Sequence, residues 1–386
     1  MMNILVINAG SSSLKFQLLK NGVCLAKGIV DSLGEKNCIF KASIGAKKIE
    51  EHIAIKTYEQ AIHKVSEFLK KQQIDAIGHR VVHGGEKYHS ATIIDQKVIK
   101  AIDELSDLAP LHNPPNLKAI LACKKLFPQL PQVAVFDTSF HQTIPEKAYL
   151  YALPYQLYEK LKIRRYGFHG PSHAYVSRET AKLLKKNSAK IITCHLGNGS
   201  SITAVHNGKS VDTSMGFTPL EGLPMGTRSG DIDPAIIFYL KKKLKLSPEK
   251  IEKILLKDSG LKGISEISWD MRKIWASAQK NNKRAQLTLS ILAYRIAKYI
   301  GAYATAMNGV DAITFTGGIG ENAWYVRKEV CQYLEFLGLQ IDSQKNKLNA
   351  TLISTPKSHI KVFVIPTNEE EEIAAETRQI LKNMVK

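Results

Sequence analysis

The chain has 386 residues, of which 44% are hydrophobic and 23% charged, an ordinary balance for a folded globular protein of about two domains. No apolar run approaches the roughly 18 residues of a membrane span, and the start MMNILVINAG lacks the basic segment of an export signal, so we expect a cytoplasmic protein. Lys and Arg (54) outnumber Asp and Glu (35), but the lysines form short runs within helical patterns, which favours a solvated basic surface over a nucleic-acid site.

The five cysteines argue against two kinds of site. They are scattered along the chain, and none forms a CxxC pair, so neither a disulfide framework nor a zinc site is expected. We predict buried, reduced thiols at Cys24, Cys38, Cys123, Cys194 and Cys331.

The first predicted element is a hairpin at the amino terminus. A β-rich run, residues 4–8, is followed by the turn Ala9-Gly10-Ser11-Ser12-Ser13 and a second run, residues 14–19. Backbone N–H groups in such a glycine- and serine-rich turn can approach a phosphate closely. The P-loop pattern is absent, so the turn predicts phosphate handling of another kind.

Charged and polar groups then follow an amphipathic helix predicted over residues 58–71. Arg80 and His83 lie beside the pair Gly84-Gly85, and Asp137 follows the apolar run 133–136. A carboxylate at a strand end can act as a base or orient a reacting group, or it can cap the next turn. Prolines at 145, 154 and 171 are compatible with a domain boundary near residue 150.

Two further glycine-rich turns lie in the second half of the chain. Residues 191–195 and 202–205 flank Leu196-Gly197-Asn198-Gly199-Ser200-Ser201, which again predicts a hairpin. The third turn, residues 317–322, follows the run 312–316 and precedes a helical pattern over 326–337. Because the two hairpins lie about half the chain apart, they indicate an internal duplication, and three phosphate-sized turns favour a phosphoryl-transferring enzyme.

The segment 216–234 is dense in glycine, proline and charge, and it contains Arg228. A loop of this length inside a compact domain is more often functional than structural, and arginine suits a phosphoryl group because its fork spans two oxygens. His169 and His173 have the spacing of a metal pair, but Pro171 between them and the missing HExxH pattern favour a hydrogen-bonding role for His169. Helices are predicted over 286–307, largely buried, and over 369–385, with an acidic first turn.

Nine motifs in order along the whole chain are similar to those of the acetate kinase (acetokinase) family. They are NAGSSSLKF (8–16), GHRVVHGGE (78–86), LAPLHNPPN (108–116), FDTSFHQTIP (136–145), RRYGFHGPSH (164–173), HLGNGSS (195–201), DTSMGFTPLEGLPMGTRSGDIDP (212–234), TGGIGEN (316–322) and PTNEEE (366–371). The resemblance implies an α/β fold of two duplicated actin-like (ribonuclease H-like) domains with the active site in the interdomain cleft. Residues 1–150 would form the N-terminal domain, joined by a C-terminal helix over 370–386, and residues 151–369 the nucleotide-binding domain.

The resemblance also implies a reaction: reversible, direct in-line phosphoryl transfer from ATP to acetate, giving ADP and acetyl phosphate with Mg²⁺, or Mn²⁺ as a substitute. The partners would be these small molecules and a second copy of the chain, without nucleic acid or membrane. By motif, the catalytic set would be Arg80, His112, Asp137, His169 and Arg228, with Arg80 also holding the substrate carboxylate. Val82, Leu111, Phe168 and Pro219 would enclose the acyl methyl group, and Asn8 and Glu369 would lie near the metal. The nucleotide would contact Ser11, Ser13, Lys15, His195, Leu196, Gly197, Asn198, Gly199, Asp270, Met271, Arg272, Gly318, Ile319, Gly320, Glu321 and Asn322.

Several alternatives remain open on the sequence. A propionate kinase of the same family differs in its substrate by one methylene, worth only ~1–3 kcal/mol in a pocket. Butyrate and sugar kinases are more distant enzyme alternatives. A nucleotide-operated chaperone or filament protein of the same fold, or a basic nucleic-acid binder, would not need the substrate-side set of Arg80, His169 and Arg228.

Overall fold

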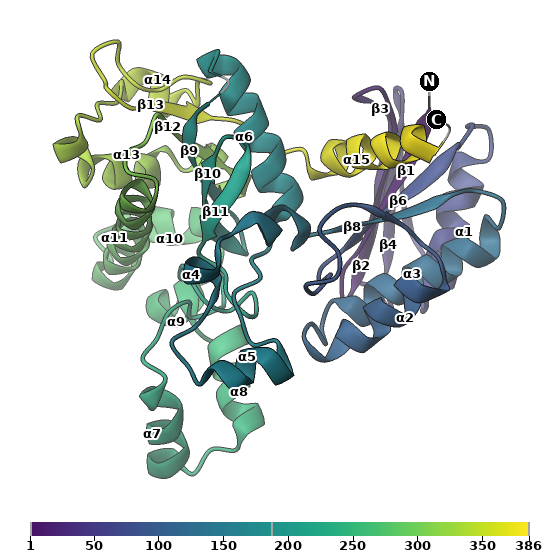
Figure 1. The fold of residues 1–386 in the computed structure, drawn as a ribbon, viewed down its shortest axis with the longest axis horizontal. Helices are drawn as coiled ribbons and strands as arrows, with labels where there is room; N and C mark the ends of the chain where they lie inside the picture. Colours follow the sequence, from purple (N-terminus) through teal and green to yellow (C-terminus); the bar gives the residue numbers. More distant parts are fainter. Residues whose placement is uncertain (1, 187, 385–386) are drawn as a thin grey trace. The chain divides into compact units, whose positions relative to one another are not determined.

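The computed structural model describes residues 2–186 and 188–384, and these residues form two compact units (Figure 1). The first unit contains the described residues up to Gln142 together with those from Asn368 onward, and the second runs from Thr143 to Thr367. Each unit is built on one β-sheet with helices on both faces. No helix among the described residues is both long and apolar enough to cross a bilayer.

The first unit has an eight-stranded sheet of order β5-β4-β3-β2-β1-β6-β8-β7. Strands β1 to β5 are antiparallel, whereas β6 and β8 continue from β1 in parallel. Its strands are β1 (Asn3–Ala9), β2 (Ser13–Lys20), β3 (Val23–Asp31), β4 (Ile39–Ile44), β5 (Lys47–His52), β6 (Ala76–Val81), β7 (Thr92–Ile93) and β8 (Gln132–Phe136). Its helices are α1 (Tyr58–Leu69), α2 (Gln96–Glu104), η1 (Leu105–Asp107), α3 (Asn113–Leu126) and α15 (Glu369–Met384), with η2 (Ser139–Thr143) at its border.

Two hydrophobic layers enclose this sheet. Leu5 and Ile7 of β1 pack with α1 and α3 on one face, while Ile4 and Val6 pack against α15 on the other. The helix α15, yellow in Figure 1, lies directly on β1 and β6. Gly78 of β6 permits this approach, because a Cβ there would lie 2.6 Å from Thr377 Oγ1. The predicted tail helix is therefore confirmed as far as Met384, and Val385 lies outside the described residues.

The second unit has a five-stranded sheet of order β11-β10-β9-β12-β13. Its strands are β9 (Lys190–Leu196), β10 (Ser200–His206), β11 (Lys209–Thr213), β12 (Ala312–Thr316) and β13 (Lys361–Val364). The helices are α4 (Glu146–Tyr149), α5 (Tyr155–Leu161), α6 (Gly170–Leu184), α7 (Ala235–Leu244), α8 (Pro248–Lys257), α9 (Gly260–Ser265), α10 (Met271–Ala278), α11 (Lys283–Ala306), α12 (Gly317–Asn322), α13 (Trp324–Gln332), η3 (Glu335–Leu337) and α14 (Ser343–Lys347).

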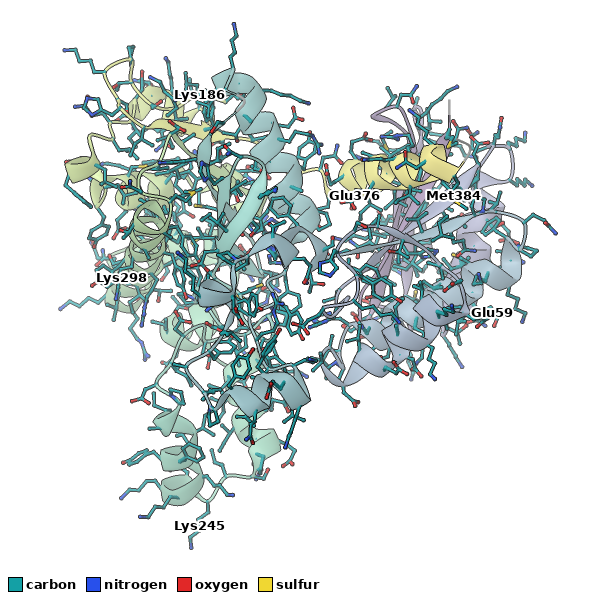
Figure 2. All side chains as sticks on the ribbon, in the orientation of Figure 1. Glu59, Lys186, Lys245, Lys298, Glu376 and Met384 are labelled. Atoms are coloured by element: carbon teal, nitrogen blue, oxygen red, sulfur yellow. The ribbon has the colours of Figure 1, made fainter. Side chains whose placement is uncertain are left out.

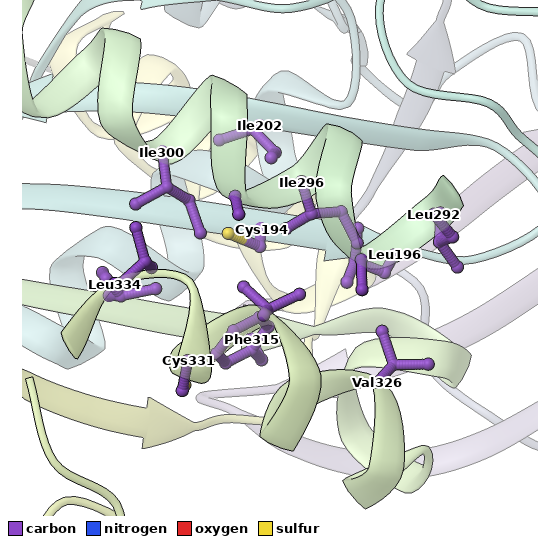
Figure 3. Close-up of a cluster of buried hydrophobic side chains, with 14 of the residues drawn as sticks. Cys194, Leu196, Ile202, Leu292, Ile296, Ile300, Phe315, Val326, Cys331 and Leu334 are labelled. Atoms are coloured by element: carbon purple, nitrogen blue, oxygen red, sulfur yellow. The ribbon is translucent and has the colours of Figure 1, made fainter. Parts of the chain in front are cut away.

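The core of the second unit lies between this sheet and the long helix α11. Figure 3 shows Cys194 and Leu196 of β9 and Phe315 of β12 packed among Leu292, Ile296 and Ile300 of α11 and Val326, Cys331 and Leu334. Successive residues of a strand point to opposite faces, so the alternate residues Thr193, His195, Ser201 and Thr203 face α6 instead. This alternation places polar side chains together beneath α6.

The predicted duplication is visible in the strand topology. The order β3-β2-β1-β6-β8 in the first unit and the order β11-β10-β9-β12-β13 in the second have the same sequence of antiparallel and parallel pairings. Both predicted hairpins, β1–β2 and β9–β10, are confirmed.

Two sequence predictions were wrong in detail. The third glycine-rich segment is not an open turn: Gly317–Asn322 forms the short helix α12, which Gly317 enters with a φ of 77°. Four cysteines are buried, but Cys24 is exposed because it lies near the start of β3 beside the turn at Asn21 and Gly22. The basic runs are solvated as expected, and Lys186, Lys245 and Lys298 all extend from the surface (Figure 2).

Candidate active-site residues

Three polar residues of the first unit lie at the carboxyl ends of adjacent parallel strands. Asn8 is near the end of β1, Arg80 near the end of β6, and Asp137 directly follows β8. These strands are neighbours in the sheet, and the carboxyl ends of parallel strands are where α/β folds commonly bind ligands. The sheet therefore brings together three residues that are far apart in the sequence.

Arg80 and Asp137 form a bidentate ion pair. Arg80 Nε donates to Asp137 Oδ1 at 2.9 Å and Nη2 to Oδ2 at 2.6 Å, while Nη1 lies 3.3 Å from Asn8 Oδ1. Asp137 is 1% exposed. Burial by itself would lower the pKa of Arg80, but the Asp137 carboxylate, together with Glu369 and Glu370, outweighs it and leaves that pKa above its ordinary value. Arg80 is thus held in one orientation, with Nη1 as the nitrogen not engaged by Asp137.

Glu369 begins α15 and belongs to the same group of charges. The pKa of its carboxyl is raised, chiefly because the group is removed from water. The Asp137 carboxylate adds to this rise, whereas the cations Arg80 and Lys15 oppose it. Asn8 and Lys15 are paired across the β1–β2 hairpin.

The β1–β2 turn is tight, since Gly10 N–H donates to Ser13 C=O at 2.8 Å. Ser11 is exposed, while Ser13 is half-buried.

The expected acyl-pocket residues of this unit have different environments. Val82 is buried, and its N–H donates to Asn116 Oδ1 at 3.0 Å, whereas Leu111 is 50% exposed. His112 precedes α3 and is half-buried.

His83, which the sequence places beside Arg80, is buried, and its Nδ1 accepts from Gly85 N–H at 3.0 Å. Burial lowers the pKa of His83 to about 3, so this imidazole is neutral.

In the second unit, His169 lies at the start of α6 and beside the β9–β10 turn. Its backbone has a φ of 57°, and its ring stacks on His195 with centroids 4.4 Å apart. His169 Nδ1 lies 2.9 Å from Ser201 Oγ, which also lies 2.7 Å from His173 Nε2. The buried, neighbouring Phe168 is 1% exposed.

His173 and Ser201 are the residues whose roles the sequence did not reveal. His173 Nδ1 lies 2.7 Å from Thr193 Oγ1, so both ring nitrogens contact hydroxyl groups. The i, i+4 spacing of His169 and His173 therefore places both rings against one hydroxyl group, that of Ser201. Ser201 was visible only as part of a glycine- and serine-rich turn, and the alternation of β10 toward α6 is the signal that could have identified it.

Arg228 lies in the long loop between β11 and α7, close to the same turn. A Cβ placed on Gly199 would lie 3.3 Å from His169 Nε2 and 3.7 Å from Arg228 Nη1. Arg228 Nη1 donates to Pro219 C=O at 3.0 Å. No Asp or Glu among residues 2–186 and 188–384 forms an ion pair with this guanidinium, and burial lowers its pKa. It is a half-buried cation without a charge partner in the described part of the chain.

The remaining expected nucleotide residues lie at the start of α10, within α12 and at the β9–β10 turn of the second unit. Asp270 accepts from Arg272 N–H as the N-cap of α10, just before Met271, and forms an ion pair with the exposed Arg272 side chain at 2.8 Å. Gly318, Ile319, Gly320, Glu321 and Asn322 lie in α12, where Glu321 Oε1 accepts from Gly317 N–H at 2.9 Å. Gly197, Asn198 and Gly199 form the turn that follows His195 and Leu196.

The repeated sheets, with polar groups at the ends of their strands, define a duplicated α/β protein with the actin-like ATPase fold. The chain belongs to the Acetokinase family, whose sequence model matches residues 3–375. Membership of this family makes it an enzyme, a phosphotransferase of the kind that acts on carboxyl groups.

Three relatives illustrate the similarity. An acetate kinase of Carboxydothermus hydrogenoformans is 54% identical over 398 aligned positions, which cover 99% of this chain and 100% of the relative. The crystal structure of Porphyromonas gingivalis acetate kinase has a TM-score of 0.94 and 44% identity over 99% of this chain and 100% of that one. A propionate kinase from Francisella tularensis also has a TM-score of 0.94, with 45% identity over 97% and 99% of the two chains.

Proposed function

We propose that this protein is an acetate kinase that transfers a phosphoryl group reversibly from ATP to acetate, by direct in-line transfer, giving acetyl phosphate and ADP. The observation that carries the proposal is the convergence of Arg228 and His169 on Gly199 in the turn between β9 and β10. A half-buried guanidinium without a carboxylate partner among the described residues suits a group that becomes more negative during the reaction. Membership of the Acetokinase family supports the choice of a carboxylate acceptor.

The nucleophile of this reaction requires no strong base. Acetate is already ionised at pH 7, so the enzyme needs to orient it and to reduce charge repulsion with the phosphoryl group. Arg80 supplies a cation whose direction is fixed by Asp137. We therefore assign the acetate carboxylate to Arg80 and an orienting role to Asp137, whereas His169 and Arg228 stabilise the transferring phosphoryl group. The half-buried His112 is the fifth member of the proposed catalytic set.

We assign the acyl methyl group to Val82, Leu111, Phe168 and Pro219 and the phosphates to the turns carrying Ser11, Ser13, Lys15 and residues 195–199. The adenosine is assigned to residues 270–272 and 318–322. Residues 1–150 with the C-terminal helix, and residues 151–369, are proposed as the two functional domains, acting on dissolved small molecules in the cytoplasm.

The residues proposed for Mg²⁺ have suitable chemistry. Glu369 carries a carboxyl whose pKa is raised by removal from water and by nearby Asp137, and a cation would relieve both effects. The Asn8 carboxamide oxygen lies in the same group, 3.3 Å from Arg80 Nη1. Within the described part of the chain no three His, Cys, Asp or Glu side chains form a metal site, but Mg²⁺ commonly takes one or two carboxylates plus phosphate oxygens and water. When bound, it would neutralise phosphate charge.

We also propose that the protein is a homodimer. The helix α7 buries none of its residues in the single chain, and it exposes Ile236, Ile237, Phe238, Tyr239 and Leu244. A short helix of this kind gains most of its stability from packing of an apolar face. Light scattering after gel filtration should give the mass of two chains, and Phe238→Glu should shift it toward one.

The proposed activity is tested with purified protein, ATP, Mg²⁺ and acetate, by trapping acyl phosphate as the hydroxamate. We expect hydroxamate with acetate and a smaller amount with propionate. A higher kcat/KM for propionate would favour the second candidate, a propionate kinase, for which the similarity to the Francisella protein is the supporting observation. No hydroxamate with either acid would contradict the proposed function.

A further inference from the structure

The loop that carries Arg228 is held by a network of buried polar contacts. Residues 214–234 join β11 to the start of α7 and contain no helix or strand. A loop of this length needs other interactions to fix a guanidinium, because loop backbone is otherwise mobile. The contacts that fix it centre on Arg165 and Glu221, neither of which belongs to the catalytic or binding sets assigned above.

Arg165 holds the beginning of the loop. Its Nη1 donates to three successive carbonyl oxygens, those of Thr213, Ser214 and Met215, at 2.9, 3.1 and 3.2 Å. Its Nη2 donates to Glu221 Oε1 at 2.5 Å. Both side chains are largely removed from solvent, with 16% exposure for Arg165 and 29% for Glu221, so this ion pair is less screened than a surface pair.

Tyr151 contacts the other oxygen of the Glu221 carboxylate. Its hydroxyl donates to Glu221 Oε2 and accepts from Phe217 N–H at 2.8 Å. Gly216 lies directly under this pair, and a Cβ there would overlap both the Glu221 carboxylate and the Tyr151 hydroxyl. The Glu221 carboxylate thus accepts hydrogen bonds from both Arg165 and Tyr151. Because Arg165 also contacts residues 213–215, these bonds hold the two ends of the segment 213–221 close together.

The same network reaches both His169 and Arg228. Tyr166 N–H and Gly167 N–H donate to Gly216 C=O at 3.0 and 3.3 Å, and they lie between Arg165 and His169 in the chain. On the other side, Pro219, whose carbonyl accepts from Arg228 Nη1, is two residues before Glu221. The far end of the loop is closed by Asp231, whose Oδ1 accepts from Gly222 N–H at 2.8 Å and whose Oδ2 accepts from the Tyr299 hydroxyl at 2.6 Å.

We propose that Arg165 and Glu221 are positioning residues that fix Arg228 relative to His169. Arg165 lies on the segment that leads into His169, and Glu221 lies in the loop that carries Arg228, so their ion pair ties the two together. This inference rests on the proposed function, in which His169 and Arg228 stabilise the transferring phosphoryl group. Because that stabilisation depends on geometry, a displacement of about 1 Å can cost roughly 10²-fold in rate.

The test is a double-mutant cycle on kcat in the full-length protein, using acetate, ATP and Mg²⁺. Glu221→Gln keeps the size of the side chain but loses the charge and one of the two strong acceptors. We expect it to lower kcat by roughly 10- to 100-fold, with the KM for ATP changed less than about threefold, since the nucleotide contacts are unaltered. In the Arg228→Ala background, the same substitution should lower kcat less than about twofold, because the residue through which Glu221 acts is gone.

Lys186→Met is the matched control. It removes the ion pair between Lys186 and Asp311, 2.7 Å long and in the same unit, and it should leave kcat unchanged. Thermal unfolding midpoints report whether each variant is folded. Should Glu221→Gln fail to fold, Tyr151→Phe takes its place in the cycle: it keeps the Arg165–Glu221 ion pair, removes the hydroxyl that bridges Glu221 and Phe217, and should lower kcat severalfold.

Three outcomes are decisive. A large kcat effect that disappears in the Arg228→Ala background supports the positioning role. An equal effect in both backgrounds, or wild-type kcat in Glu221→Gln, overturns this inference while leaving the proposed function intact. A wild-type protein without acetate- or propionate-dependent turnover overturns the proposed function and this inference together.

Discussion

Arg80 and Arg228 are the two arginines assigned to the reaction, and the two units place them in opposite electrostatic environments. Arg80 lies at the end of β6 and is neutralised by a bidentate contact with Asp137. Arg228 lies in an irregular loop, donates to a backbone carbonyl and has no carboxylate partner among the described residues. Its pKa is lowered by burial, whereas that of Arg80 is raised above its ordinary value.

This difference separates two tasks that one residue type can perform. A guanidinium paired with a carboxylate has a fixed direction but a reduced net charge, which suits binding of a substrate that stays anionic. A guanidinium without a charge partner keeps its full attraction for an anion, and in a dry environment that attraction is stronger. The strand end supplies the rigid direction, while the loop supplies the uncompensated charge.

The largest effect is expected from removing the uncompensated cation. Arg228→Ala should lower kcat roughly 10³-fold or more, as for arginines that stabilise phosphoryl transfer in other enzymes, with a smaller change in the KM for ATP. Steady-state kinetics with acetate measures both constants. Arg284→Ala, which removes the ion pair with Glu266 in the same unit, is the control; near wild-type kcat in Arg228→Ala would contradict the transition-state role.

A somewhat smaller loss is expected when the paired arginine loses its partner. Asp137→Asn should lower kcat by about 10²-fold, because Arg80 keeps its charge but is no longer held in one orientation. Circular dichroism should show a folded protein. Asp311→Asn, which removes the partner of Lys186, should retain wild-type turnover; if Asp137→Asn did so too, Asp137 would not belong to the site.

The first unit also buries a histidine next to Arg80, and its effect is on stability. Burial lowers the pKa of His79 to about 4, although a hydrogen bond from His79 Nε2 to Gln132 Oε1 opposes the shift. The folded chain keeps His79 neutral down to that pH, whereas the unfolded chain binds the proton near pH 6.5. This part of the stability is therefore fully present above pH 6.5 and is lost as the pH falls toward 4.

The loss should amount to about 3 kcal/mol of unfolding free energy. Urea unfolding at pH 7 and pH 4 measures it as the difference between the wild type and His79→Gln, in which this titration is absent. The same substitution at the exposed His52 should leave the pH dependence unchanged. If the unfolding free energies of the wild type and His79→Gln had the same pH dependence, protonation of His79 would not destabilise the folded chain.

The smallest effect concerns the acyl group beside Arg80. Val82→Ala should raise the ratio of kcat/KM for propionate to that for acetate by roughly fivefold, since room for one methylene is worth about 1 kcal/mol in an apolar pocket. Val81→Ala is the matched control, because Val81 packs in the core between the sheet and α2. An unchanged ratio in Val82→Ala would remove Val82 from the pocket.

Much of the fold could be predicted because local signals were strong. The β1–β2 and β9–β10 hairpins follow from β-rich runs on either side of glycine- and serine-rich turns, and their similarity predicts the duplication seen in both sheets. The apolar spacing of residues 58–71 likewise predicts α1. These features depend on contacts between residues close in the sequence, so short patterns determine them.

The predictions that were wrong, and the residues that were missed, have several origins. Gly317–Asn322 forms a helix because Glu321 turns back to accept from Gly317 N–H, a contact that glycine content alone does not predict. Cys24 is exposed because it lies near the solvated start of β3. The roles of Ser201 and Glu221 depend on partners 32 and 56 residues away, His169 and Arg165.

The sequence by itself determined the residue types available for phosphate chemistry, the two hairpin turns and the family to which the chain belongs. Only the tertiary structure decided which charges are paired. Arg80 and Arg228 carry the same side chain, and both lie in glycine-rich motifs. Their difference arises because parallel strands place Asp137 against the first, while the folded loop brings a backbone carbonyl and the Met225 sulfur to the second, but no carboxylate of the described residues. Burial then acts on the charge that remains.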